Sequence, residues 1–384
     1  MGLVVACLSL DGAAAAADGF RGDLTVAGRF DERPPIAEQG NWIGSIAPEI
    51  GFSRHAAFAN YDAFARRRFD SMLGNAAPRP ASDVARGTFN GASSENLSWD
   101  VVGDYYRSRD PLDQDPRFTP SPGITQSARG HARLSLWRGE AEYQAQNHNN
   151  TAPSLSDAWS QAATAAIFPM RTPQGAWVMT GRYQDWTDDN VRTLAAVTGL
   201  TGYRRYHTPT VSSELQLGAV SRNRSSEGYE SPEFAWTVAF EGLLGALGLP
   251  LSSRLRVGHE VATTGSAELW HEVGGLKWTA EYSRSIQAEG GRFSTPTTRD
   301  YAALGVENSR LPVTLTLQGS YGYSKPPAGQ GDALETWRGE AGLSRAMQPW
   351  LTGHVRYSYL WQKDGGGADF HRNRAEVGLT AALQ

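Results

Sequence analysis

Charged side chains at alternate positions of strand-like segments are the residues of this sequence best suited to chemistry. Several runs of about ten residues carry arginine or glutamate in one phase and apolar residues in the other. Because side chains alternate between the two faces of a strand, each run places its charges on a single face. Such charges bind ions and water or form salt bridges. The candidates for this charged face are Arg182, Glu214, Glu281, Arg338, Glu340, Arg356 and Glu376.

The common catalytic and metal-binding motifs are missing from the sequence. There is no Gly-x-Ser-x-Gly elbow, no phosphate-binding P-loop and no His-Glu-x-x-His. His259-Glu260 and His271-Glu272 are isolated dipeptides, and in a strand their side chains point to opposite faces. We therefore predict that the protein is not an enzyme and uses no metal or cofactor. An outer-membrane hydrolase, with Ser, His and acidic residues unlinked in the sequence, stays as an alternative.

The strand assignment depends on a period of two, which is clearest over residues 313–323. Leu315, Leu317 and Tyr321 fall in one phase, and Thr316, Gln318 and Ser320 fall in the other. A helix would mix these two sets. Similar runs recur along the chain, separated by turns rich in Gly, Pro, Asn and Asp. The fold class predicted from this pattern is all-β.

Connectors between these runs alternate mostly between short turns and longer polar loops, which is the pattern of a transmembrane β-barrel. We count about 18 strands, within a range of roughly 16 to 20. The segment 119–147 is long enough to hide a hairpin, whereas 69–86 and 107–122 read as irregular surface loops. The prediction is a single antiparallel up-and-down transmembrane barrel over residues 18–384, preceded by a signal peptide at 1–17.

Composition excludes several other classes of protein. The 384 residues have mean hydropathy −0.44 and no apolar run near 18 residues, which excludes a protein of transmembrane helices. A single Cys excludes a disulfide scaffold. A net charge of −4 with pI near 6.1 gives no global basic field, so nucleic acid is not an expected partner.

The apolar residues of each strand share one face, which we expect to contact lipid, and the charged residues share the other face, which we expect to contact water. Charges in mid-strand cost about 2–4 kcal/mol on a lipid-facing surface but are natural in a wet lumen. Trp and Tyr near both strand ends match the aromatic girdles at the two membrane interfaces. The alternative is a solvated face of a soluble sheet. The predicted girdle consists of Trp177, Trp186, Trp350, Tyr359 and Trp361.

Two segments carry a resemblance to a known family. Residues 46–53 (IAPEIGFS) and 372–380 (RNRAEVGLT) resemble bacterial outer-membrane β-barrels encoded with capsule and exopolysaccharide systems, including exosortase-associated ones. The resemblance implies the bacterial outer membrane as location, a polysaccharide-export or channel role and no catalytic residues.

The expected function is therefore an outer-membrane channel for polysaccharide export or for small solutes. Its expected partners are outer-membrane lipid and a periplasmic polysaccharide-export protein. The charged face either lines an open path or forms a salt-bridge ladder that plugs the barrel. In the second case the protein would be a structural barrel that anchors an envelope complex.

Overall fold

The computed structural model describes most of the chain after residue 17. The described residues are 18–31, 41–72, 79–94, 97–108, 110, 124–150, 157–188, 191–223, 230–247, 252–260, 262–287, 297–310, 312–325, 332–364 and 369–383. The predicted signal peptide at 1–17 lies outside them. No helix in this part of the chain is long and apolar enough to cross a membrane.

The described residues form one large antiparallel sheet and one short helix. The helix, α1, spans Leu243–Ala246. The strands are β1 (Gly19–Asp31), β2 (Asn41–His55), β3 (Ala59–Met72), β4 (Arg79–Ser94), β5 (Leu97–Ser108), β6 (Thr125–Leu136), β7 (Gly139–Asn150), β8 (Ala158–Ile167), β9 (Arg171–Thr172), β10 (Gly175–Asp188), β11 (Val191–Thr208), β12 (Val211–Asn223), β13 (Glu233–Glu241), β14 (Ser252–His259), β15 (Thr263–Val273), β16 (Leu276–Gln287), β17 (Thr297–Asn308), β18 (Thr314–Lys325), β19 (Leu334–Gln348), β20 (Leu351–Asp364) and β21 (Phe370–Leu383).

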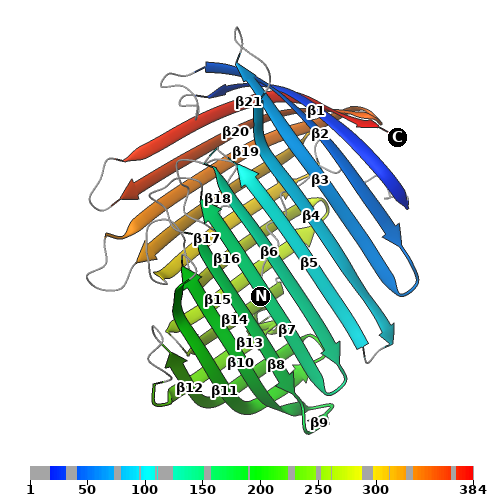
Figure 1. The fold of residues 1–384 in the computed structure, drawn as a ribbon. Helices are drawn as coiled ribbons and strands as arrows, with labels where there is room; N and C mark the ends of the chain where they lie inside the picture. The colour runs from blue at the N-terminus through cyan, green and yellow to red at the C-terminus, as the bar shows by residue number, and fades with distance from the viewer. Residues whose placement is uncertain are drawn as a thin grey trace.

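The sheet closes on itself into a barrel. Each strand pairs with its neighbours in the chain, and β1 pairs with β21 from Gly22↔Leu383 to Asp31↔Arg374. Figure 1 shows the blue β1 beside the red β21, with the strands inclined around the ring. Within the described residues the two-residue β9 pairs only with β10, so 20 strands form the ring. The predicted all-β up-and-down barrel is confirmed, and 20 lies at the upper end of the expected range.

Two segments account for the difference between 18 and 20. The segment 119–147 contains most of the hairpin of β6 (Thr125–Leu136) and β7 (Gly139–Asn150), closed by a turn at 137–138. Residues 69–86, expected to be an irregular loop, instead contain the end of β3 and the start of β4. One face of β4 presents Ala85, Gly87 and Gly91, so its alternation is too weak to recognise in the sequence.

The connectors define two rims. The turn rim holds the short connectors, such as 56–58, 137–138, 209–210, 274–275 and 349–350. The loop rim holds most of the longer ones, such as 32–40, 109–124, 224–232 and 288–296. Two unlike rims follow from an up-and-down meander, because successive connectors alternate between its ends.

The outer face of the barrel is apolar and exposed. Val26, Leu317, Leu343, Val355 and Leu379 belong to this face and are each 44–50% exposed. In register, Val26 pairs with Leu379, Leu317 with Ala341, and Leu343 with Val355. A continuous apolar surface of this kind requires a nonaqueous neighbour to cover it.

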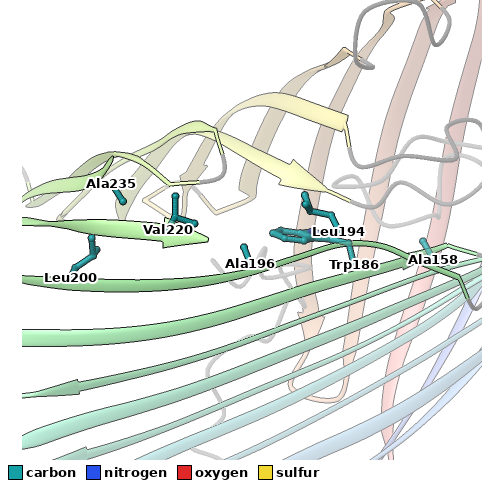
Figure 2. Packing of buried hydrophobic residues seen from close by; sticks show 7 residues of the cluster. All are labelled: Ala158, Trp186, Leu194, Ala196, Leu200, Val220 and Ala235. Atoms are coloured by element: carbon teal, nitrogen blue, oxygen red, sulfur yellow. The ribbon is translucent and has the colours of Figure 1, made fainter. Parts of the chain in front are cut away.

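Among the described residues, the inner face carries polar side chains and two apolar clusters, of which Figure 2 shows the larger one and the smaller one consists of Phe168, Ala176 and Val178. Contacts between strands that are not neighbours identify this face, because such side chains meet only inside the ring. Arg204 of β11 lies 3.7 Å from Glu140 of β7, although β8 and β10 separate these strands. The larger apolar cluster consists of Ala158, Trp186, Leu194, Ala196, Leu200, Val220 and Ala235.

Candidate functional site: charged clusters on the inner face

Arginines from three strands meet two aspartates near the loop rim. This arginine cluster consists of Arg29 on β1, Arg68 and Asp70 on β3, Arg372 and Arg374 on β21, and Asp110 in the connector after β5. Its members lie on strands that surround the point where the sheet closes. Register places Asp31 of β1 opposite Arg374 of β21, so these arginines come together only when the ring is complete.

Asp110 is at the centre of the arginine cluster. Arg372 donates from Nη1 to Asp110 Oδ1 at 2.7 Å and from Nη2 to Oδ2 at 3.2 Å, which is a bidentate pair. Arg374 Nη2 donates to the same Oδ2. Arg29 Nη1 and Arg68 Nη2 lie 3.8 and 3.9 Å from that oxygen. One carboxylate therefore faces four guanidinium groups.

The second aspartate compensates the cluster only in part. Arg29 Nη2 lies 2.5 Å from Asp70 Oδ2, and Arg68 Nε lies 3.2 Å from Asp70 Oδ1. Among these six residues the arginines outnumber the aspartates by two, and Arg374 and Arg68 also interact electrostatically with Glu376. Arg29 is 1% exposed, and its buried Nε has no hydrogen-bond acceptor in the described part of the chain. Arg29 thus has a spare donor beside a concentration of guanidinium groups, and both features favour an anion.

A second set of ion pairs lies farther around the ring, and we call it the ladder. Arg204 of β11 donates from Nε to Glu214 of β12 at 2.5 Å, and Arg133 of β6 donates to Glu140 at 3.0 Å. Arg182 of β10 pairs with Glu260 beyond β14. These contacts pair charges of opposite sign across neighbouring and non-neighbouring strands.

The seven predicted charged residues all fall on the polar phase of their strands. Glu340 and Arg356 pair at 3.2 Å between Glu340 Oε1 and Arg356 Nε, and Arg356 is opposite Glu376 in register. Glu376 also lies 3.5 Å from His354. Arg338 is on β19 with Glu340, whereas Arg182 and Glu214 belong to the region of the ladder. Glu281 is on β16, and in register it is opposite Glu268 of β15. Whether they line a path for solutes stays a prediction.

The predicted aromatic residues divide between the two faces. Trp177 is 48% exposed on the outer face near the turn rim, with its ring 5.8 Å from that of Tyr203. Trp350 is exposed in the turn 349–350, and Tyr359 and Trp361 are half-buried members of the outer phase of β20. Their role in a girdle at a membrane interface stays a prediction.

Trp186 does not belong with the outer aromatic residues. It is 5% exposed and packs in the inner apolar cluster of Figure 2. It lies nine positions after Trp177 in the same strand, and an odd separation reverses the face. The expectation of a girdle position for Trp186 was therefore wrong.

The arginine cluster was not recognised in the sequence. Arg372 and Arg374 share the phase of Glu376, so alternation would have assigned them to the charged face. Asp110 has no such signal, because it belongs to the segment 107–122 that was expected to be an irregular surface loop. It is instead 2% exposed inside the ring. Within the described residues, no group of three His, Cys, Asp or Glu could hold a metal ion.

Solved structures that resemble this chain include proteins of Pseudomonas aeruginosa and Acinetobacter baumannii, and one of them, OpdK, is described as an outer membrane protein. OpdK of Pseudomonas aeruginosa, solved with vanillate, has a TM-score of 0.41 and 9% identity over 95% of this chain and 99% of its own. OccK2 (OpdF) of the same organism, solved with glucuronate, has a TM-score of 0.40 and 10% identity over 96% of this chain and 100% of its own. OccAB3 of Acinetobacter baumannii has a TM-score of 0.36 and 7% identity over 95% and 99%. No family model and no curated protein matches the chain.

Proposed function

We propose that this protein is a channel of the bacterial outer membrane that passes small solutes and prefers anions. The observation that carries the proposal is the closed ring with an exposed apolar exterior and a charged interior. A closed barrel satisfies all backbone hydrogen bonds between strands, which is the condition for crossing lipid without helices. The apolar exterior then faces the acyl chains, and lipid is the partner.

The preference for anions comes from the arginine cluster. Its four guanidinium groups and the spare Nε donor of Arg29 attract carboxylate or phosphate groups and repel cations. The bidentate Arg372–Asp110 pair is also the geometry in which an arginine binds a carboxylate from a solute. We infer that small carboxylates compete with Asp110 for these donors.

Small solutes suit this interior better than a polymer. Two charged clusters and a buried apolar cluster occupy the inner face, so the interior offers local charged sites along the wall. Polysaccharide export and a periplasmic delivery partner stay untested predictions. So do a hydrolase activity and a plugged structural barrel.

Planar-bilayer recording of the purified, folded protein tests the proposal. We expect single-channel steps and, under a KCl gradient, a reversal potential of the sign given by chloride preference. Arg372→Gln combined with Arg374→Gln should reduce the chloride preference, whereas Arg345→Gln on the outer phase of β19 is the matched control. A folded sample without single-channel steps would refute an open channel. A preference unaffected by the double variant would refute the role of the cluster.

A further inference from the structure

Three exposed arginines lie on adjacent connectors of the turn rim, and we call them the arginine platform. Arg138 is in the turn between β6 and β7, Arg171 is in β9, and Arg205 is near the end of β11. Arg205 shares the outer phase of Trp177 and Tyr203, since Gly175 pairs with Arg205 and Trp177 with Tyr203. All three side chains are exposed. Neither Arg138 nor Arg205 has an acceptor among the described residues.

Backbone hydrogen bonds hold these connectors together. Phe168 N–H donates to Arg138 O at 2.9 Å, Trp177 N–H donates to Met170 O at 2.9 Å, and Tyr206 N–H donates to Gln174 O at 3.0 Å. Arg171 also donates from Nη1 to Trp137 O at 2.9 Å, and its guanidinium lies 4.9 Å from the centre of the Trp137 ring. The backbone that carries the platform and the Arg171 side chain are therefore positioned before any ligand binds, which lowers the entropy cost of binding.

An apolar groove lies on the outer face of the same strands. It has a volume of about 780 Å³, and its lining residues come from strands β5 to β11. Small residues form part of its lining, among them Ala141, Ala165 and Gly181, and Leu134 and Tyr143 border it. A Cβ added at Gly181 would meet no atom within 4 Å, so the groove is open there.

The platform and the groove are the right distance apart for one lipid. Gly181 is four residues along β10 from Trp177, which is about 13 Å along the strand and about 10 Å in depth for a strand inclined by about 40°. One leaflet of the hydrocarbon core is about 15 Å thick. An acyl chain that starts at the level of Trp177 would therefore reach the groove, while its phosphate lies beside the arginines.

The outward-facing arginines near the loop rim differ because they have acidic partners. Arg67 Nε lies 2.6 Å from Asp83, Arg107 lies 3.6 Å from the same carboxylate, and Arg284 lies 3.8 Å from Asp300. At the platform, no carboxylate pairs with Arg138 or Arg205 in the part of the chain that the structure describes. This asymmetry in charge is what an anionic ligand at the turn rim would complement.

We propose that the platform and the groove form a binding site for one anionic glycerophospholipid of the adjoining leaflet. Its phosphate accepts hydrogen bonds from Arg138 and Arg205, and an acyl chain occupies the groove above them. Arg171 adds positive charge from the inner side of the same rim, where it is opposite Ala176 in register and 6.0 Å from the Phe168 ring. Headgroup recognition by clustered arginines beside a membrane is electrostatic and selects anionic lipids. The inference rests on the membrane location given under the proposed function, but not on transport.

Native mass spectrometry of the full chain, released from detergent micelles, tests this site. The probes are phosphatidylglycerol and phosphatidylcholine with identical acyl chains. We expect at least about fivefold more retained phosphatidylglycerol, since about 1 kcal/mol per arginine near the surface is typical. The triple variant Arg138→Gln, Arg171→Gln, Arg205→Gln should lose this preference. Arg54→Gln with Arg345→Gln, which changes exposed arginines elsewhere on the turn rim, should keep it.

A second variant tests the groove without changing charge. Gly181→Leu fills the open space and should lower retention of the lipid even if the triple variant fails to fold. Equal retention of both lipids, or retention unaffected by both the triple variant and Gly181→Leu, would overturn the site. A dimer that Gly181→Leu abolishes would assign the groove to a second copy and would also overturn it.

Conductance of the same samples separates the two proposals. The triple variant should conduct as the wild-type protein does, because the platform lies at the turn rim, away from the arginine cluster near the loop rim. A wild-type protein that retains phosphatidylglycerol but never conducts would refute the channel alone. A conducting protein whose lipid retention is the same in the wild type and the triple variant would refute the lipid site alone.

Discussion

Replacing Asp110 by Asn should increase the preference of the channel for anions. The change removes one negative charge from a cluster of four arginines and two aspartates, so the formal charge of the cluster rises by one unit. Asn keeps the size and an acceptor oxygen. The electrostatic field near Asp110 therefore changes more than the shape of the path.

The size of the effect follows from Coulomb's law. For a monovalent ion passing about 6 Å from this carboxylate in water, one unit charge is worth about 0.7 kcal/mol. The Debye length of about 10 Å at 0.1 M salt reduces this to roughly 0.4 kcal/mol. An anion gains this energy and a cation loses it, so the permeability ratio should rise roughly four- to tenfold.

Reversal potentials in planar bilayers under a KCl gradient measure this ratio. Recordings near 0.1 M salt are needed, because at 1 M the Debye length is only about 3 Å. Asp110→Glu retains the charge and is the matched control. Because buried arginines left without a partner cost about 3–5 kcal/mol, folding is checked by thermal unfolding in detergent.

Arg372→Gln changes the charge in the opposite direction and should lower the ratio. An unchanged ratio in a folded, conducting Asp110→Asn protein would refute the placement of the cluster beside the ion path. A ratio that falls in both Asp110→Asn and Arg372→Gln would refute the electrostatic explanation.

Three further predictions concern the two faces of the barrel. Leu317→Arg on the outer face should destabilise the folded protein in lipid vesicles by about 2–4 kcal/mol, whereas Gln318→Arg on the inner face should destabilise it much less. Equal losses of stability in urea titrations would contradict the assigned faces. Arg356→Glu, which reverses the charge beside Glu340, should shift reversal potentials toward cations, and an unshifted potential would place it away from the ion path. Trp177→Ala should lower stability in lipid by about 1–3 kcal/mol through lost burial at the interface, while in the same titration Trp186→Ala should be costlier because it leaves a cavity in the inner cluster.

The alternation of apolar and polar residues in the sequence was sufficient to predict the all-β barrel. Alternation over Leu315, Leu317 and Tyr321 against Thr316, Gln318 and Ser320 assigned both the strand and the two faces that the pairing of β18 confirms. This works because a period of two is a local property of extended backbone. The seven charged candidates were placed on the polar phase by the same rule.

Local patterns failed where the apolar phase is made of small residues. β4 presents Ala85, Gly87 and Gly91 on its outer phase, and its contrast with Val84 and Arg86 is too weak to indicate a strand. Pairing with β3 and β5 nevertheless makes it one, since the neighbours satisfy its backbone groups. Hydrogen bonding across the sheet, which the sequence pattern does not reveal, therefore explains part of the difference between the predicted count of about 18 strands and the 20 strands of the ring.

The sequence by itself determined the strand period, the two unlike faces and the meander of hairpins, because each depends on residues close together in the chain. Only the tertiary structure brought Arg29, Arg68, Arg372 and Arg374 around Asp110, since Asp110 and Arg372 are 262 positions apart. Ring closure between β1 and β21 joins the two ends of the barrel and decides which arginines share a carboxylate. No local pattern contains that information, because the contact exists only when the ring is complete.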